Sequence, residues 1–292
     1  MRKRVIIALW LIISVSACIY GQIVYDLYDT PPVEGNGLTG EEQTNAKGTV
    51  WNISHASIEV YFPDKENNHA QAVLIFPGGG YRSLSWGHEG RWSAEWLKEN
   101  GITAVIVKYR LPNGHRMIPL SDALEAMRYV RKHSAEWGIN SNQIGVMGFS
   151  AGGHLTATLC TKYTDSITRP DFAILYYPVI RLSNHTNSKK HLIGENATEK
   201  TVDFFDAVRH VTSCTPPTIF FAASTDSVVH VDETIEYVSA LISNGVYAEA
   251  HIYPEGKHGF CFKKEFPYHR QMTQSLYEFL ERQRNDKEKK RK

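Results

Sequence analysis

Residues 148–154 read GFSAGGH and come directly after the largely apolar run 143–147. Three glycines within six residues cost backbone entropy on folding, so this turn needs a geometry that bulkier residues prevent. Residues 148–152 fit the pattern G-x-S-x-G, in which a serine sits on a strained turn between a strand and a helix. The pattern predicts Ser150 as a nucleophile, provided that the rest of the chain supplies the groups that activate a hydroxyl.

Length and composition indicate one globular domain. The chain has 292 residues, of which 42% are hydrophobic and 22% are charged, and its formal net charge is +1. This length is enough for a single domain with a sizeable core, and the balance of residue types is ordinary. A net charge close to zero gives no overall field that would favour nucleic acid as a partner.

The first 21 residues have the pattern of a secretory signal. The basic start MRKR precedes the apolar run VIIALWLIISV, which is shorter than the ~20 residues that span a bilayer. Two cleavage points compete: VSAC at 15–18 resembles a bacterial lipobox and would leave a lipidated Cys18, whereas cleavage before Gln22 would release a soluble protein. In both cases we expect a mature protein that is secreted, periplasmic or lipid-anchored at the cell surface, with no membrane span.

Strand patterns alternate with helix patterns from residue 55 to residue 284, which predicts βαβ units and a mainly parallel sheet. The predicted strands are 71–76, 102–110, 143–148, 172–178, 217–224 and 247–254, preceded by a half-exposed strand at 57–63. The predicted helices lie at 91–101, 119–138, after Ser150, at 232–245 and around the apolar positions Met272, Leu276, Phe279 and Leu280. Ser121 is the expected N-cap of the second helix.

The remaining segments are predicted to lie outside this domain or on its surface. Residues 22–54 are polar and rich in turn residues, which favours an extended N-terminal arm. Residues 181–215 are polar and irregular and are expected to form an insertion over the sheet edge. Residues 285–292 are mainly basic and are expected to form a disordered tail.

Two acid–base partners for Ser150 follow predicted strands. Asp226 comes after the strand 217–224, and His258 comes after the strand 247–254. The carboxyl ends of strands in an open α/β sheet are where ligand-binding residues collect, and the order Ser, Asp, His is typical of this arrangement. In the expected triad His258 takes the proton of Ser150, while Asp226 orients the imidazole and stabilises its charged form.

The glycine-rich loop FPGGGY is the candidate oxyanion hole. Three glycines after a buried strand leave backbone N–H groups uncovered, and we expect the amides of Gly79, Gly80 and Ala151 to stabilise a tetrahedral intermediate. Asp232 competes with Asp226 as the acid, but it is the better start for the next helix. His154 is expected to pack beside the serine turn.

Taken together, several stretches resemble the secreted bacterial α/β-hydrolases related to acetylxylan and feruloyl esterases, many of which carry xylanase labels. They are FPGGGYRSLSWGHEG, VKYRLP, IGVMGFSAGGHL, PTIFFAASTDSVVH and HIYPEGKHGF. The likeness covers roughly residues 55 to 282 and implies an α/β-hydrolase fold, with a mainly parallel doubly wound sheet flanked by helices. It carries the family's nucleophile, acid and base to Ser150, Asp226 and His258, and its oxyanion glycines to 78–80. His230 departs from the proline usual in relatives.

The expected function is that of a serine esterase that removes short acyl groups, acetyl first, from plant polysaccharides or oligosaccharides such as xylan. An acylated carbohydrate is therefore the expected partner, and no metal or organic cofactor is implied. Two alternatives stay open: a serine peptidase of the prolyl-oligopeptidase type, and a hydrolase-fold binding protein without turnover. A histidine such as His88 has no expected catalytic role. The four cysteines lack metal-site spacing, and a disulfide among Cys160, Cys214 and Cys261 stays undecided, as does the oligomeric state.

Overall fold

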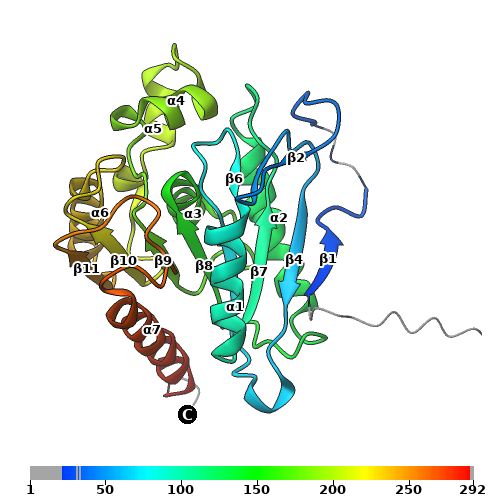
Figure 1. Cartoon of the computed structure of the whole chain (residues 1–292), viewed down its shortest axis with the longest axis vertical. Coiled ribbons are helices and arrows are strands. Elements are labelled where there is room, and N and C mark those ends of the chain that lie inside the picture. Colours follow the sequence, from blue (N-terminus) through cyan, green and yellow to red (C-terminus); the bar gives the residue numbers. More distant parts are fainter. Residues whose placement is uncertain (1–21, 31, 33, 290–292) are drawn as a thin grey trace, which may run out of the picture.

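In the computed structural model, which describes residues 22–30, 32 and 34–289, one eight-stranded sheet runs through the molecule (Figure 1). Its strands are β1 (Gln22–Asp26), β4 (Ser57–Tyr61), β5 (Ala72–Phe76), β7 (Thr103–Lys108), β8 (Ile144–Phe149), β9 (Ala173–Tyr176), β10 (Thr218–Ala223) and β11 (Ala248–Tyr253). They lie in the order β1-β4-β7-β5-β8-β9-β10-β11. All neighbours from β7 to β11 are parallel, and only β1 and β4 run antiparallel to their neighbours. The predicted mainly parallel sheet is confirmed.

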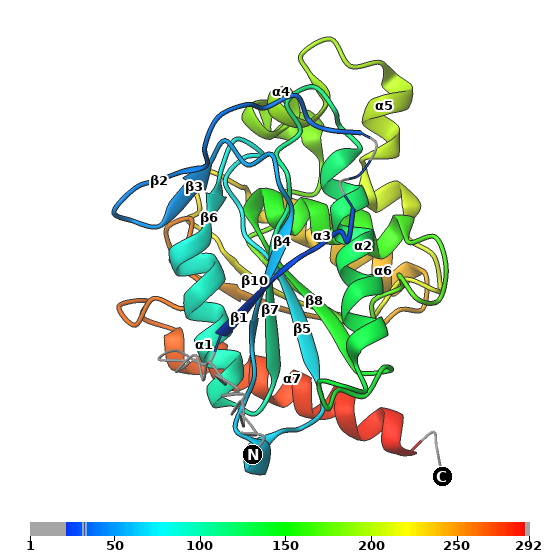
Figure 2. The same ribbon diagram turned by 90° about the vertical axis from the view of Figure 1, so that its right-hand side faces the viewer.

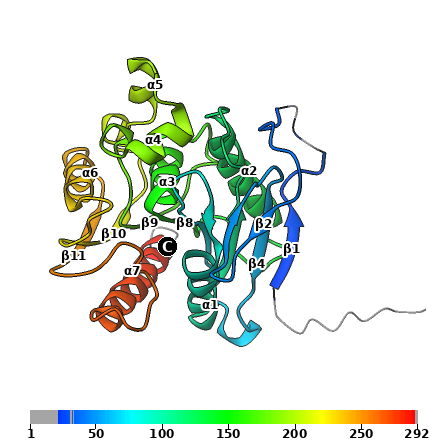
Figure 3. The same ribbon diagram turned by 45° about the horizontal axis from the view of Figure 1, so that its top comes forward.

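Helices cover both faces of this sheet. They are α1 (Trp92–Glu99), α2 (Ile118–His133), α3 (Ser150–Lys162), α4 (Thr186–Ile193), α5 (Glu199–Phe204), α6 (Val231–Ser243) and α7 (His269–Lys289). Figure 2 shows α1 on one side of the sheet and α2, α3 and α6 on the other. Figure 3 shows α7 on the same side as α1. Such a sheet, covered on both faces, explains why β5, β7 and β8 read as continuous apolar runs.

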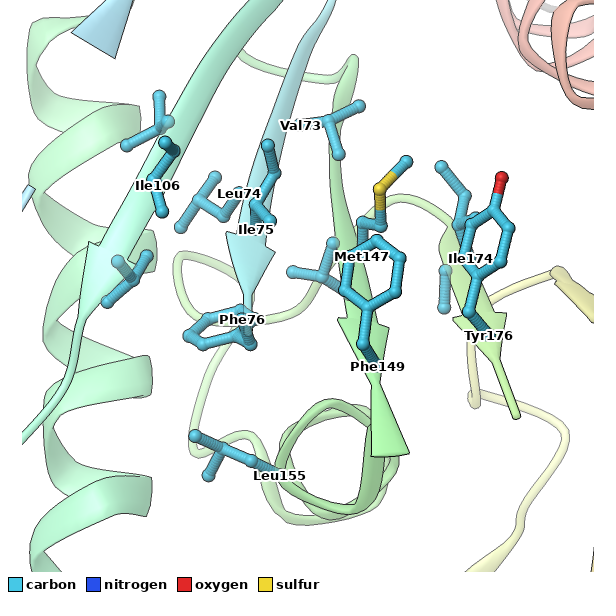
Figure 4. Close-up of a cluster of buried hydrophobic side chains, with 14 of the residues drawn as sticks. Val73, Leu74, Ile75, Phe76, Ile106, Met147, Phe149, Leu155, Ile174 and Tyr176 are labelled. Atoms are coloured by element: carbon cyan, nitrogen blue, oxygen red, sulfur yellow. The ribbon is translucent and has the colours of Figure 1, made fainter. Parts of the chain in front are cut away.

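The core is densest around the strands that carry the serine turn. Figure 4 shows side chains from β5, β8 and β9 packed together with Leu155 of α3. Within this cluster the ring of Tyr176 stacks on Phe149 at 4.9 Å and on Phe221 at 4.7 Å, measured between ring centroids. These three rings sit at paired positions on β8, β9 and β10. Each aromatic pair contributes about 0.5–1.5 kcal/mol beyond the area it buries, so the ladder ties together the strands beneath the candidate site.

The segment 22–54, predicted as an extended arm, contributes strands to the domain. β1 pairs with β4 at the edge of the main sheet. Further along, β2 (Gln43–Thr44) and β3 (Thr49–Trp51) form a three-stranded sheet with β6 (Leu84–Ser85), which directly follows the glycine loop. The pairing of Val50 with Leu84 places the arm against that loop.

A buried ion pair fastens the same segment to the body of the domain. The guanidinium of Arg110 donates to Asp122 at 2.6 Å, and both side chains are at most 4% exposed. The hydroxyl of Tyr28 donates to the same carboxylate at 2.6 Å, and Arg110 also donates to the carbonyl of Glu34 at 2.7 Å. A buried charge is costly unless it is paired and fully hydrogen-bonded, so the residues around Tyr28 and Glu34 are needed to complete this cluster.

Two expectations about individual elements are wrong. β4 is buried along its whole length rather than half-exposed, because the carboxylate of Glu59 accepts from the hydroxyl of Tyr61 at 2.5 Å and lies 3.4 Å from the guanidinium of Arg91. Both faces of β4 are therefore buried, although its polar and apolar residues alternate.

Ser121 is not an N-cap, because α2 begins at Ile118 and the Ser121 hydroxyl donates to the Ile118 carbonyl at 2.8 Å inside the helix.

Two segments predicted to lack regular structure are partly helical. α7 continues to Lys289, so residues 285–289 are helical rather than a disordered tail. The last three of them, Lys287, Glu288 and Lys289, are good helix formers. The apolar positions predicted for this helix are confirmed as buried: Met272, Leu276, Phe279 and Leu280. The insertion 181–215 contains α4 and α5, whose first turns are capped by the side chains of His185 and Thr198 rather than marked by apolar periodicity.

The predicted signal segment 1–21, including Cys18, lies outside the described residues. Among the helices that the structure describes, none combines the length and the apolar character needed to cross a membrane. Cys160, Cys214 and Cys261 are free thiols, the first and last of them buried.

Candidate active site

The serine predicted from the GFSAGGH stretch sits on a strained turn between β8 and α3. Ser150 has a φ of 51°, in the left-handed region that side chains with a Cβ rarely adopt. The turn is possible because α3 begins almost in contact with neighbouring backbone: a Cβ on Gly152 would overlap the carbonyl oxygens of Phe76 and Pro77. A Cβ on Gly148 would overlap Thr156 and the Gly152 carbonyl. The glycines are therefore needed for close approach, as well as for the turn itself.

The structure brings the three predicted residues Ser150, Asp226 and His258 into one hydrogen-bonded chain. Nε2 of His258 lies 2.9 Å from Oγ of Ser150, and Nδ1 lies 2.7 Å from Oδ2 of Asp226. A carboxylate only accepts, so Nδ1 carries the proton that is donated to Asp226 and Nε2 is left as the acceptor for the Ser150 hydroxyl. This is the geometry that a general base needs.

Asp226 is held in place by backbone groups beside His258, whereas Asp232 pairs with a different histidine, His230. Oδ1 of Asp226 accepts from the N–H groups of Val228 at 2.8 Å and Val229 at 3.1 Å, and the side chain is only 1% exposed. Asp232 lies in the first turn of α6, is 70% exposed and faces His230 at 3.0 Å. The structure thus separates the two aspartates as expected from the sequence.

The glycine loop lies beside Ser150. Gly79 and Gly80 line the same cavity as Ser150 and His258, and the Gly79 carbonyl accepts from the N–H groups of Arg82 and Ser83, which closes a tight turn. Ala151 is buried in the first turn of α3, at the positive end of the helix dipole. The N–H of Gly78 is already donated to a side chain, so among the three loop glycines the amides of Gly79 and Gly80 stay the predicted oxyanion donors.

The side chain that takes the Gly78 amide is Glu89, which sequence reasoning missed. It lies in the π-helical turn Trp86–Arg91 that leads into α1 and is only 3% exposed. Oε2 accepts from the Gly78 N–H at 2.7 Å, and Oε1 accepts from the hydroxyl of Tyr177 at 3.0 Å. Burial raises the pKa of Glu89 above its usual value, and the bond from Gly78 works in the opposite direction.

Glu89 links the glycine loop to the histidine through Tyr177. The ring of Tyr177 packs edge-on against the imidazole of His258, with centroids 4.7 Å apart. The Glu89 carboxylate therefore holds two groups in place: the Gly78 amide of the glycine loop, and the Tyr177 ring that packs against His258. In the sequence Glu89 lies between two glycines just before the helix predicted at 91–101, and no pattern there predicts this role. In the structure it lies in a π-helical turn, and such turns often occur at functional sites.

His154 packs beside the serine turn, as expected. It is fully buried, its Nε2–H donates to the Phe205 carbonyl at 2.9 Å, and Nδ1 accepts from the Tyr81 hydroxyl at 2.7 Å. Burial lowers the pKa of His154 to about 4, so the ring is neutral and joins the glycine loop, α3 and the insertion 181–215 without adding charge.

The cavity over Ser150 has a volume of about 500 Å³ and a polar, basic lining. Besides His258, its cationic or potentially cationic side chains are Arg82, His88, His185, His191 and Lys263, and the acid among the described lining residues is the buried Glu89. His88, which was given no role from the sequence, therefore lies at the site; burial is the main cause that lowers its pKa, followed by the charge of Lys263. The insertion 181–215 also forms part of the cavity wall, through His185 and His191.

Comparison with known proteins agrees with this geometry. The family described as alpha/beta hydrolase fold matches residues 73–262. The chain belongs to this α/β-hydrolase family. It is 38% identical to the acetylxylan esterase of Xylanibacter ruminicola over 261 residues, covering 83% of this chain and 52% of that protein. It is 31% identical to endo-1,4-beta-xylanase B of Butyrivibrio fibrisolvens over 204 residues, covering 64% of this chain and 32% of that protein.

A solved structure of an α/β-hydrolase relative is similar over nearly its full length. The acetyl ester-xyloside bifunctional hydrolase from Caldicellulosiruptor lactoaceticus superposes with a TM-score of 0.74 at 32% identity, covering 89% of this chain and 95% of that one. By contrast, the chain spans about half the length of the acetylxylan esterase and about a third of the xylanase. The resemblance stated from the sequence is thus confirmed at the level of fold and family.

Replacing Glu89 tests its structural role. Glu89→Ala leaves the Gly78 N–H and the Tyr177 hydroxyl buried without an acceptor, and we expect the free energy of unfolding to fall by roughly 1–3 kcal/mol for each group. Urea unfolding of both proteins measures this difference. Glu89→Gln can still accept from Gly78 and donate to Tyr177, so it should retain most of the stability that Glu89→Ala loses. Equal losses in the two variants would contradict the assigned role.

The raised pKa of Glu89 also gives the sign of a pH effect. A carboxyl whose pKa is higher in the folded state stabilises the fold below its usual pKa of 4.5, and that contribution is lost as the pH rises through the folded-state pKa. Glu89→Gln does not titrate, so its stability relative to the wild type should increase as the pH rises from about 4.5 to neutrality. A difference that stays constant over this range would count against a raised pKa.

Proposed function

We propose that this α/β-hydrolase is a serine esterase that removes short acyl groups, acetyl first, from plant cell-wall polysaccharides or oligosaccharides such as xylan. The observation that carries the proposal is the hydrogen-bonded chain from Ser150 through His258 to Asp226, in the wall of a cavity beside a glycine loop. Neither a structural role nor simple binding requires an imidazole nitrogen 2.9 Å from the hydroxyl of a serine on strained backbone.

In the proposed reaction Nε2 of His258 takes the proton of Ser150 as Oγ attacks the acyl carbonyl. The resulting imidazolium is stabilised by Asp226, whose other oxygen stays fixed by two backbone N–H groups. His258 then gives the proton to the departing sugar oxygen and leaves an acyl-enzyme. Nε2 of His258 then takes a proton from a water molecule as the water oxygen attacks the acyl carbon. The bond between that carbon and Oγ breaks, Oγ takes the proton back from His258, and the carboxylic acid leaves.

The amide N–H groups of Gly79, Gly80 and Ala151 donate to the negatively charged oxygen of each tetrahedral intermediate. Each well-placed donor in an oxyanion hole stabilises the transition state by about 3 kcal/mol. The amides of the loop are pre-oriented because the turn after Gly79 is closed by two backbone bonds and Gly78 is tied to Glu89.

The lining of the cavity favours a small acyl group on a polar alcohol. Val228 is the single apolar side chain among its described lining residues, and the others are glycines and polar or charged groups. A long fatty acyl chain would find no matching apolar groove there. The matched proteins named acetylxylan esterase and acetyl ester-xyloside hydrolase point to the same class of substrate.

Substitution of the triad tests the mechanism. We expect Ser150→Ala and His258→Ala each to reduce kcat on p-nitrophenyl acetate by several orders of magnitude, with the double variant scarcely worse than either. Asp226→Asn should fold normally and lose roughly 10³–10⁴ in kcat, because the imidazole is no longer held in the required tautomer. Asp232→Asn is the matched control and should stay near the wild type. Near-wild-type turnover by Ser150→Ala would end the proposal.

A panel of substrates tests the acyl and sugar specificity. The enzyme should release acetate from acetylated xylo-oligosaccharides and should hydrolyse p-nitrophenyl acetate much faster than p-nitrophenyl palmitate. Equal activity on the palmitate would refute the short-acyl assignment. Faster cleavage of a peptide anilide than of either ester would instead establish a peptidase, and a fully inert protein would establish a binding role.

We also propose that the protein acts outside the cytoplasm. The support is the basic start, the apolar run and the small residues at 15–18. Mass spectrometry of the protein from its native host should find the segment before Gln22 removed, or a lipidated Cys18 at the N-terminus. A chain that retains Met1 would overturn export.

A further inference from the structure

A second cavity adjoins the one over Ser150. It has a volume of about 710 Å³, within the range of roughly 300–1,000 Å³ typical of ligand sites. The two cavities share Gly79, Arg82 and His191 as lining residues, so they meet at the glycine loop. Much of the second cavity is formed by residues 38–52, which precede the part of the chain that the family matches.

The amides in this cavity present both donors and acceptors. Asn45 uses its Oδ1 to accept from two backbone N–H groups, and its Nδ2 has no partner among the described residues. Asn52 and Asn113 do the reverse: their Nδ2 groups donate to backbone carbonyls, and each Oδ1 has no partner there. A ligand rich in hydroxyl groups needs such a mixture, since each hydroxyl donates one hydrogen bond and accepts others.

Trp51 offers an aromatic surface in the same cavity. It is half-buried on β3, and its Nε1–H donates across the strand pair to Oε1 of Gln43 at 2.7 Å. The polar edge of the indole is therefore held, and within the described residues its ring makes no contact with another ring. A fixed, unstacked indole beside polar amides suits the apolar face of a sugar ring, which is flanked by hydroxyls.

Arg82 stands where the two cavities meet. Its side chain is exposed and has no hydrogen bond or ion pair with the described residues, and none of the described residues that line the second cavity carries a carboxylate. The guanidinium keeps its five donors for a ligand that crosses from one cavity to the other.

We propose that the second cavity is a glycan subsite, which holds sugar units next to the acylated one and uses the Trp51 indole as a stacking platform. The inference rests on the proposed function, because it assumes that the acylated substrate belongs to a sugar chain. The acyl group enters the cavity over Ser150, and the chain passes Arg82 toward Trp51. The subsite acts on binding of the chain and leaves the chemistry at Ser150 unchanged.

Kinetics on substrates of different length test the subsite. Trp51→Ala should raise the KM for a long acetylated xylo-oligosaccharide about tenfold, because it removes stacking that is equal in the ground and transition states. The kcat on that substrate should be retained, and kcat/KM on p-nitrophenyl acetate, which cannot reach Trp51, should not change. Trp51→Phe keeps a flat ring and should restore most of the affinity.

Trp92→Ala is the matched control. Trp92 is a tryptophan on α1 with 50% exposure that lines neither of the two cavities. Its removal should leave the ratio of oligosaccharide to p-nitrophenyl acetate activity as in the wild type. If Trp51→Ala behaves like Trp92→Ala while the wild type deacetylates the oligosaccharide, the subsite is refuted and the proposed function stands.

Binding without turnover separates the two proposals. Calorimetry of unacetylated xylohexaose with Ser150→Ala should show binding that is weakened about tenfold when Trp51→Ala is added. If the wild type hydrolyses p-nitrophenyl acetate but releases no acetate from the oligosaccharide, the proposed sugar substrate fails, and calorimetry alone then decides the cavity. Heat that depends on Trp51 would support the glycan subsite, and no binding of xylohexaose would overturn it.

Discussion

The contact between two backbone segments, the start of α3 and the end of β5, sets the geometry of the whole site. The carbonyls of Phe76 and Pro77 lie where a side chain of Gly152 would be, so the helix that begins at Ser150 rests directly on the strand that runs into the glycine loop. The predicted nucleophile Ser150 and the predicted oxyanion donors of the glycine loop therefore belong to two elements that pack directly on each other, without flexible side chains between them. Interiors packed this closely transmit small displacements instead of absorbing them.

The titratable side chains buried around this contact are either neutral or hydrogen-bonded to several partners. His154 is kept uncharged by burial, and Glu89 is kept in place by two donors. The permanently cationic side chains that line the cavity, Arg82 and Lys263, are exposed or half-exposed to solvent. The buried carboxyl groups of Asp226 and Glu89 each accept from at least two donors, so neither is buried without partners.

The residues of the triad could be predicted because each one is marked locally. Ser150, Asp226 and His258 all follow strands of the parallel sheet, and the glycines that surround the serine are visible as a pattern. The strands of the parallel sheet were predictable for a similar reason, since burial on both faces of a sheet produces uninterrupted apolar runs.

Other features depend on partners far away in the chain. Glu89 is polar by type and becomes buried only because Gly78 and Tyr177 donate to it. β1 is a five-residue strand whose Ile23 and Val24 stay largely exposed, and it forms by pairing with the edge of β4. In the same way α4 and α5 have capping side chains but no apolar stripe long enough to be recognised. Residue propensities and apolar periodicity carry no information on partners that lie far away in the sequence.

The pairing of β3 with β6 bears on where the functional unit begins. A boundary at residue 55, or at residue 73 where the family match starts, would remove the strand that covers Leu84 and leave the short β6 without a neighbour. It would also take away Glu34 and Tyr28 from the buried Arg110–Asp122 pair. The contacts that hold the glycine loop and the buried ion pair therefore extend back to Tyr28, well before the start of the family match.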